Sequence, residues 1–178
     1  MKLASKSKNR LELLESIQGG ISTQDVFETI DYKSQSEDEI KQFIYPHLLD
    51  QLTEYVMEKK GFGRGLAKEK ARTMIKWEGS TKTTVKNMHF MGTSNRPDMT
   101  VESGGVKIAI EFKRGDRGSA LREGFGQSVI YSTAYDFVIC IFIDTSEEGK
   151  ILNGSTAVTE QNFLENLWDN FNVKFVIV

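Results

Sequence analysis

The chain has 178 residues and a formal net charge of −2 at pH 7, which is enough for one domain with a full core. We therefore expect a single domain over residues 1–178. One cysteine and two histidines exclude a disulfide framework and a zinc cluster. No segment is apolar enough to span a membrane, and the basic N-terminus lacks the apolar segment of a signal peptide. We expect a cytoplasmic protein with no membrane partner.

Residues 1–35 predict an N-terminal helical extension. Leu11, Leu14 and Ile17 fall on one helical stripe. The pair Gly19-Gly20 follows that stripe and favours a helix end there, because glycine is a common helix terminator.

Two further helices and a strand are predicted next. A long helix is expected over about 36–60, followed by a glycine-rich loop over 61–65 and a second helix over about 66–77. The loop lacks the Lys-Ser or Lys-Thr ending of a phosphate-binding loop. A strand is expected over about 82–90.

The next segment predicts a β-hairpin. Gly104-Gly105 lies between two apolar-rich runs and favours a two-residue turn. Counting outward from that turn places Asp98 opposite Glu111, and opposed residues have Cβ atoms roughly 5 Å apart on one face of the pair. Lys113 points to the same face, while Ile108 and Ile110 point to the other.

This grouping of Asp98, Glu111 and Lys113 suits metal-assisted phosphate chemistry. Two close carboxylates repel each other, and a divalent cation relieves the repulsion. Mg²⁺ is commonly held by one or two protein carboxylates together with waters and phosphate oxygens. A nearby lysine can orient or deprotonate water, or stabilise a negatively charged transition state. The alternative is an ordinary charged cross-strand pair on an exposed hairpin.

The string Pro97-Asp98…Glu111-Phe112-Lys113 resembles the motif of the PD-(D/E)xK nuclease superfamily. The resemblance implies an α/β fold with a restriction-endonuclease-like αβββαβ core, in which helices flank a mixed central sheet, and residues 36–144 carry its motifs. It also implies Mg²⁺ as cofactor, with Mn²⁺ able to substitute. Asp98, Glu111 and the Phe112 carbonyl would bind the metal, and Lys113 would assist the water or the transition state.

A second likeness lies in a helix predicted over Ser119–Ala134. Gln127 and Tyr131 match the QxxxY motif of the RecB-like branch of that superfamily, where such residues support catalysis. Positions four apart share a helix face, so both can point toward the sheet. The alternative is an ordinary polar seam between helix and sheet.

The start of the 36–60 helix resembles the first core helix of these nucleases. An acidic residue there often joins the metal site, and Glu37 occupies the corresponding position. The competing interpretation is structural, because Ser36 and Glu39 form a capping-box pattern and acids in a first turn favour the helix dipole.

The C-terminal part predicts a buried strand over Phe137–Asp144, which contains Cys140. Within 145–178 we expect a helix over 160–171 and a final strand over 173–178. Cys140 lies in the apolar run of the first of these strands, which indicates a buried core residue rather than a nucleophile.

The basic residues are unevenly distributed. Lys and Arg outnumber acids between Lys59 and Lys86 and again just after the Glu-Phe-Lys strand, which suits a phosphate backbone. A solvated helix face is the alternative for the first run. The predicted nucleic-acid-binding residues are Arg64, Lys68, Arg72, Arg114 and Arg117.

Together these features predict a metal-dependent DNA endonuclease that hydrolyses phosphodiester bonds. Its partner would be nucleic acid, with a homodimer or a larger nuclease complex as further possibilities. One alternative is a catalytically silent nuclease-fold subunit for DNA binding or assembly. Another is an unrelated α/β protein with a charged hairpin, which would serve as an oligomer interface.

Overall fold

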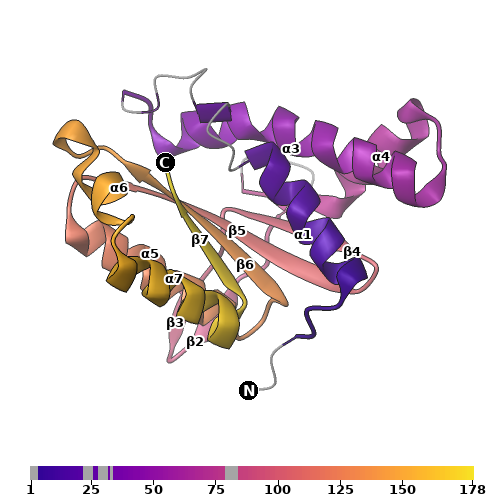
Figure 1. The fold of residues 1–178 in the computed structure, drawn as a ribbon. Coiled ribbons are helices and arrows are strands. Elements are labelled where there is room, and N and C mark those ends of the chain that lie inside the picture. Colours follow the sequence, from indigo (N-terminus) through magenta and orange to yellow (C-terminus); the bar gives the residue numbers. More distant parts are fainter. Residues whose placement is uncertain (1–3, 22–25, 28–31, 33, 79–83) are drawn as a thin grey trace.

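The computed structural model describes residues 4–21, 26–27, 32, 34–78 and 84–178. Figure 1 shows its helices and strands. In chain order they are α1 (Lys8–Ile21), α3 (Glu37–Lys60), α4 (Arg64–Met74), β1 (Ile75–Trp77), β2 (Met88–Phe90), β3 (Thr93–Asn95), β4 (Met99–Ser103), β5 (Val106–Gly115), α5 (Gly118–Tyr131), β6 (Phe137–Asp144), a 3-10 turn η1 (Glu147–Gly149), α6 (Lys150–Gly154), α7 (Val158–Phe171) and β7 (Val173–Ile177).

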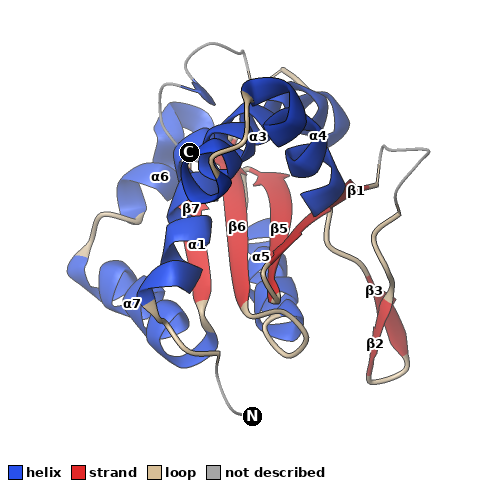
Figure 2. Ribbon diagram, turned by 90° about the vertical axis from the view of Figure 1, so that its right-hand side faces the viewer, coloured by secondary structure: helices blue, strands red, loops and turns tan. Residues whose placement is uncertain are grey.

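A five-stranded mixed sheet with the order β1-β4-β5-β6-β7 forms the centre of the molecule. The β1–β4 and β4–β5 pairs are antiparallel, whereas β5–β6 and β6–β7 are parallel. Helices α1 and α3 pack on one face of this sheet and α5 and α7 on the other (Figures 1 and 2). The predicted α/β class with a mixed central sheet flanked by helices is confirmed.

The hairpin between β4 and β5 has the predicted turn and register. Gly104 and Gly105 have φ angles of 58° and 78°, which only glycine adopts without strain and which a two-residue turn of this hand requires. Ser103 pairs with Val106 and Met99 with Ile110. The next step of that register places Asp98 opposite Glu111.

The two faces of β5 differ in character, as expected from alternation along a strand. Ile108, Ile110 and Phe112 are fully buried against α1 and α3. The opposite face carries Glu111 and Lys113 toward α5. The prediction for β6 is also confirmed, since every residue of Phe137–Asp144 is buried.

Capping residues fix both ends of α3. The Ser36 side chain accepts a hydrogen bond from the Glu39 backbone, and the Glu39 carboxylate accepts one from the Ser36 backbone. At the other end Gly61 has φ 65° and its N–H donates to the Met57 carbonyl. The first-turn position of Glu37 therefore follows from a local signal in the sequence.

The expected end of the first helix at Gly19-Gly20 is wrong. Helix α1 continues to Ile21, and Gly20 is buried against α3. A Cβ atom at this position would lie 2.5 Å from Cγ of Gln51. Gly20 therefore permits close packing of two helices instead of ending one of them.

The second helix and the first core strand also differ from expectation. Helix α4 starts at Arg64 and ends at Met74, and the last predicted helical residues form β1, which pairs with β4. Within the predicted strand over 82–90, residues 79–83 lie outside the described part, and Met88–Phe90 pairs with β3 in a separate ribbon. Figure 2 shows this ribbon beside the main sheet. The αβββαβ order holds with β1 as its first strand.

The remaining elements follow the prediction closely. Helix α5 begins at Gly118 and ends at Tyr131, α7 begins at Val158, and β7 ends at Ile177. Between β6 and α7 lie η1 and α6, for which no element was predicted. Among the described residues no helix is both long and apolar enough to cross a membrane.

Candidate active site

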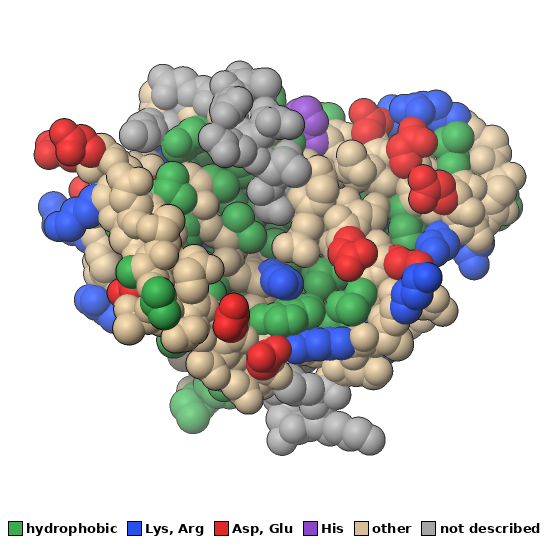
Figure 3. All heavy atoms as spheres, in the orientation of Figure 1, with side chains coloured by type: hydrophobic (Ala, Val, Ile, Leu, Met, Phe, Trp, Pro, Cys, Tyr) green, Lys and Arg blue, Asp and Glu red, His purple; other side chains and the backbone are tan. Residues whose placement is uncertain are grey.

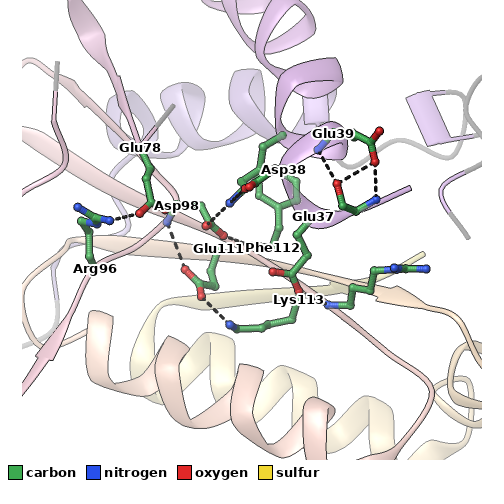
Figure 4. Close-up of polar contacts among 12 residues, drawn as sticks. Glu37, Asp38, Glu39, Glu78, Arg96, Asp98, Glu111, Phe112 and Lys113 are labelled. Carbon is green, nitrogen blue, oxygen red and sulfur yellow. Dashed lines mark hydrogen bonds and ion pairs between the residues drawn. The ribbon is translucent and has the colours of Figure 1, made fainter. Parts of the chain in front are cut away.

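The three residues of the predicted motif lie together at the ends of β4 and β5. The Asp98 backbone N–H donates to Oε2 of Glu111 at 3.3 Å. The Lys113 Nζ lies 3.4 Å from Oε1 of Glu111. Figure 4 shows the carboxylate of Glu111 between Asp98 and the Lys113 amine. The hairpin thus brings two acids and one cation to one place.

Asp98 is held by two donors from different elements. Its Oδ2 accepts the Phe112 backbone N–H at 2.8 Å, and its Oδ1 accepts Lys41 Nζ at 3.0 Å. Lys41 comes from α3, its side chain is 9% exposed, and it also contacts Asp38 at 2.7 Å. The carboxylate of Asp98, 13% exposed, therefore carries a compensating charge.

Lys41 was not predicted as a site residue. A signal for Lys41 exists in the sequence, because it shares one helical stripe with Ile44 and Leu48. In the fold all three side chains are buried. A lysine on an apolar stripe indicates a buried cation, and buried charges require a partner. The stripe alone does not say which acid that partner is.

Glu111 has a strongly perturbed proton affinity. Burial, followed by the charge of Asp98, raises the pKa of Glu111 to about 8, against the opposing effect of Lys113. The residue is only 4% exposed. Burial therefore favours the protonated form of Glu111, whereas Lys113 and any added cation favour the ionised form.

The pKa of Lys113 is raised, whereas that of a typical buried lysine is lowered. Burial lowers the pKa of Lys113, but the negative charges of Glu111, Glu37 and Glu123 outweigh it, and the pKa lies above its usual value. The amine is therefore protonated at neutral pH. This favours a role in charge stabilisation over a role as a base, both of which the sequence left open.

Glu37 lies at the edge of this cluster. Its Oε1 accepts the backbone N–H of Arg114 at 3.0 Å and so links the first turn of α3 to β5. Its charge also acts on Lys113. Figure 4 shows the Glu37 side chain pointing down from α3 toward the strand. Glu39, in contrast, is engaged in the capping box.

The acidic side chains do not form a ready-made cage for a metal. In the described part of the chain, no group of three or more His, Cys, Asp or Glu side chains is placed to hold a metal ion. Asp98 and Glu111 nevertheless fit a hard divalent cation, because Mg²⁺ needs only one or two carboxylates besides water and phosphate. Each carboxylate oxygen also accepts more than one contact.

The two helix residues of the predicted QxxxY motif differ in position. Tyr131 is buried, and its pKa is raised by burial first and then by the charges of Glu111 and Asp98. Gln127 donates weakly to Glu123 at 3.5 Å, and its Oε1 is buried with no partner. The structure thus brings Tyr131 to the carboxylates and Gln127 one helical turn away.

The basic residues of α4 lie beside acids of α3. Arg64 pairs with Glu54, and Lys68 lies 3.7 Å from Asp50. Both acids belong to the middle and C-terminal part of α3, away from its first turn at the site. Over α4, at the right of Figure 3, Lys and Arg side chains lie next to Asp and Glu.

The other predicted binding residues take three positions. Arg72 lies exposed on α4. Arg114 lies on β5 next to Lys113, with its backbone bound to Glu37. Arg117 precedes α5 with a side chain that is 82% exposed and 3.7 Å from Asp116. Arg114 and Arg117 therefore lie nearer the carboxylates along the chain than the α4 residues do.

Replacement of Lys41 by methionine is expected to destabilise the fold. The change keeps an unbranched side chain that is one atom shorter but leaves Asp98 without its buried cation, and breaking a buried ion pair costs about 3–5 kcal/mol. Urea unfolding of the purified variant measures the loss. The double variant Lys41→Met/Asp98→Asn removes the isolated charge and is expected to recover part of it. Equal losses in the single and double variants would contradict this account.

Comparison of the chain with protein-family models, curated proteins and solved structures finds no match. The resemblance to the PD-(D/E)xK superfamily therefore rests on the residues of this chain alone.

Proposed function

We propose that this protein is a metal-dependent DNA endonuclease that hydrolyses phosphodiester bonds at the Asp98–Glu111–Lys113 cluster. The observation that carries the proposal is this grouping of a buried carboxylate pair with a lysine. Asp98 and Glu111 come from the two sides of the hairpin, and the pKa of Glu111 is raised to about 8. Perturbed groups of this kind gather at functional sites.

Each residue has a distinct part in the proposed reaction. Asp98 and Glu111 would hold Mg²⁺, which would supply a Lewis acid and a water of lowered pKa. Lys113 places a fixed positive charge where negative charge develops on the phosphate. Tyr131, buried beside the carboxylates, supports their placement from α5. The Phe112 backbone N–H orients Asp98, and the Phe112 carbonyl is the further metal ligand that the resemblance implies.

Glu37 is the optional third acid of the proposal. Its link to the Arg114 backbone fixes the first turn of α3 above β5, and its charge adds to the field that keeps Lys113 protonated. In this role Glu37 supports the positive charge of Lys113, and as the optional acid it would add a carboxylate to the metal site. Gln127 remains a supporting residue on α5.

A cleavage assay tests the proposal. Labelled single-stranded, duplex, nicked and branched DNA substrates are incubated with the protein and Mg²⁺ or Mn²⁺, and the products are separated by size. We expect cleavage of at least one substrate, no cleavage in EDTA, and none with Asp98→Asn. If neither metal supports cleavage of any substrate in the panel, the proposed endonuclease activity is refuted.

A silent DNA-binding subunit is the second candidate. One observation favours it: Lys41 already neutralises Asp98 without a metal ion. Calorimetric titration with Mg²⁺ separates the two functions. The endonuclease requires a binding isotherm that Glu111→Gln removes, whereas a silent subunit gives no heat with either protein.

Charge reversal on α4 tests the predicted DNA path. Replacing Arg64, Lys68 and Arg72 by Glu is expected to lower DNA affinity and to make its salt dependence shallower, since each lost phosphate contact reduces the number of counterions released. Fluorescence anisotropy over a range of salt concentrations measures both. The carboxylate cluster is untouched, so cleavage at low salt should persist. An unchanged salt dependence would show that Arg64 and Lys68 do not contact phosphates because they are already paired with Glu54 and Asp50.

A further inference from the structure

Among the residues that the structure describes, a cleft lies on the α3 side of the edge strand β1, next to Asp98. Its volume is about 620 Å³, within the range of small-molecule and nucleotide sites. The cleft is lined by Asp38, Lys41, Gln42, Tyr45, Trp77 and Glu78.

Two aromatic rings form one wall of the cleft. Tyr45 of α3 and Trp77 of β1 stack with ring centroids 5.1 Å apart and an angle of 25° between their planes. Both side chains are half-buried, with one part packed on the core and another part lining the cleft. A stacked aromatic surface that faces a polar cleft is suited to a flat ring, because nucleobases stack on aromatic side chains regardless of base identity.

The cleft is joined directly to the proposed site. Lys41 lines the cleft and bonds Asp98 at 3.0 Å. The Glu78 backbone N–H donates to the Asp98 carbonyl at 3.1 Å, and Trp77 pairs with Met99, the residue after Asp98. A ligand in the cleft is therefore a neighbour of any phosphate held by Asp98 and Glu111.

Charge in the cleft suits an uncharged ring more than a phosphate. Lys41 contacts both Asp38 and Asp98, and Figure 4 shows Arg96 beside Glu78. The two cations at the cleft are therefore already engaged by acids, which leaves no free positive charge among these residues for a phosphate. The Gln42 side chain is exposed and carries an amide, which both donates and accepts hydrogen bonds at the edge of a base.

We propose that this cleft binds an unpaired nucleobase of a single-stranded DNA segment, stacked on Tyr45 and Trp77, beside the phosphate at the cleavage site. The placement of that phosphate rests on the proposed function. A base inside an intact duplex reaches such a cleft only by leaving its stack, which costs a few kcal/mol. The substrate is therefore DNA that is already unpaired at the point of cleavage.

Tryptophan fluorescence tests the cleft without depending on cleavage. The chain has two tryptophans, and Trp168 lies on α7, so Trp168→Phe leaves Trp77 as the reporter. Titration with a short oligodeoxythymidine in EDTA is expected to quench Trp77, while a blunt duplex of matched sequence does not. The converse variant Trp77→Phe reports from Trp168 and is expected to show no quenching.

A substitution in the other ring tests the contribution of stacking to affinity. Tyr45→Leu keeps an apolar side chain on α3 and removes the ring, so affinity for the oligodeoxythymidine should fall about 10-fold. Tyr55→Leu, on the same helix and away from the cleft, is the matched control and should bind like the wild type. Circular dichroism confirms that both variants are folded, and if Tyr45→Leu is not, Gln42→Ala replaces it with a smaller expected loss.

The outcomes separate this inference from the proposed function. Equal quenching of Trp77 by duplex and single strand, or no quenching, refutes the binding of an unpaired base in the cleft even if the protein cleaves DNA. Quenching of Trp77 by the single strand alone supports it even if no cleavage is found, and the silent subunit then becomes a single-strand-binding protein.

Discussion

Replacement of Lys113 by methionine is expected to reduce DNA cleavage by about 1,000-fold, since removal of one preorganised electrostatic group costs this much in other enzymes. Methionine keeps an unbranched side chain one atom shorter than that of lysine and lacks the charge and the N–H donors. Burial lowers the pKa of Lys113, but the neighbouring acids outweigh this effect and keep the amine protonated. Single-turnover cleavage at saturating Mg²⁺ measures the loss.

The same variant should bind DNA almost as well as the wild type. One half-buried amine is a small part of a phosphate-binding surface, whose affinity comes from many contacts. Lys107→Met is the matched control, because Lys107 lies on the same strand but is exposed and near the hairpin turn. A Lys113→Met protein that cleaves at more than a tenth of the wild-type rate would remove Lys113 from the mechanism.

The hairpin could be predicted from the sequence because all its determinants are local. Two glycines with positive φ fix the turn, and the side-chain period of two then fixes which residues face each other. A slip of one residue would turn Ile108 and Ile110 away from the core, so the register of Asp98 and Glu111 follows from burial of their neighbours. The capping box likewise placed the first turn of α3.

The parts that could not be predicted depend on contacts between distant segments. Ile75 and Trp77 continue an acceptable helical pattern, and only pairing with Val101 and Met99 makes them a strand. Lys41 becomes a site residue only because α3 lies across the end of β4, far along the chain. The cleft beside Asp98 exists for the same reason.

The distribution of charge was a weaker guide than the hairpin. The sequence shows Arg64 and Lys68 as part of a basic run, but the fold places Glu54 and Asp50 against them. Pairs of opposite charge from separate helices are invisible in a count along one segment. A basic run therefore predicts a binding surface only where no second element neutralises it.

The stability of the metal-free protein is expected to fall as the pH rises through the neutral range. The pKa of Glu111 is about 8 in the folded state, compared with about 4.3 for an unfolded glutamate. Between these values the folded protein holds a proton that unfolding releases, so a higher pH favours unfolding. The slope from this residue approaches about 1.4 kcal/mol per pH unit.

Glu111→Gln should remove this slope and make the metal-free protein more stable than the wild type at pH 8, because a neutral amide needs no proton there. Urea unfolding between pH 5 and about 8.5 in EDTA measures the free energy for both proteins. Glu102→Gln, an exposed position on β4, is the control and should keep the wild-type profile. Parallel profiles for the wild type and Glu111→Gln would show that burial of Glu111 does not govern the pH dependence.

Saturating Mg²⁺ should reverse the trend in the wild type alone. A cation on Asp98 and Glu111 favours the ionised carboxylate, so the metal-bound protein gains stability as pH rises, by about 2.7 kcal/mol when Mg²⁺ reaches a hundred times its Kd. Glu111→Gln should gain much less. If Mg²⁺ raised the free energy of unfolding equally in both proteins, the ion would bind at another site. If it raised the free energy of unfolding in neither protein, Lys41 and Lys113 would be the only cations that this carboxylate pair binds. In that case the raised pKa of Glu111 would be a cost of folding rather than a preparation for metal.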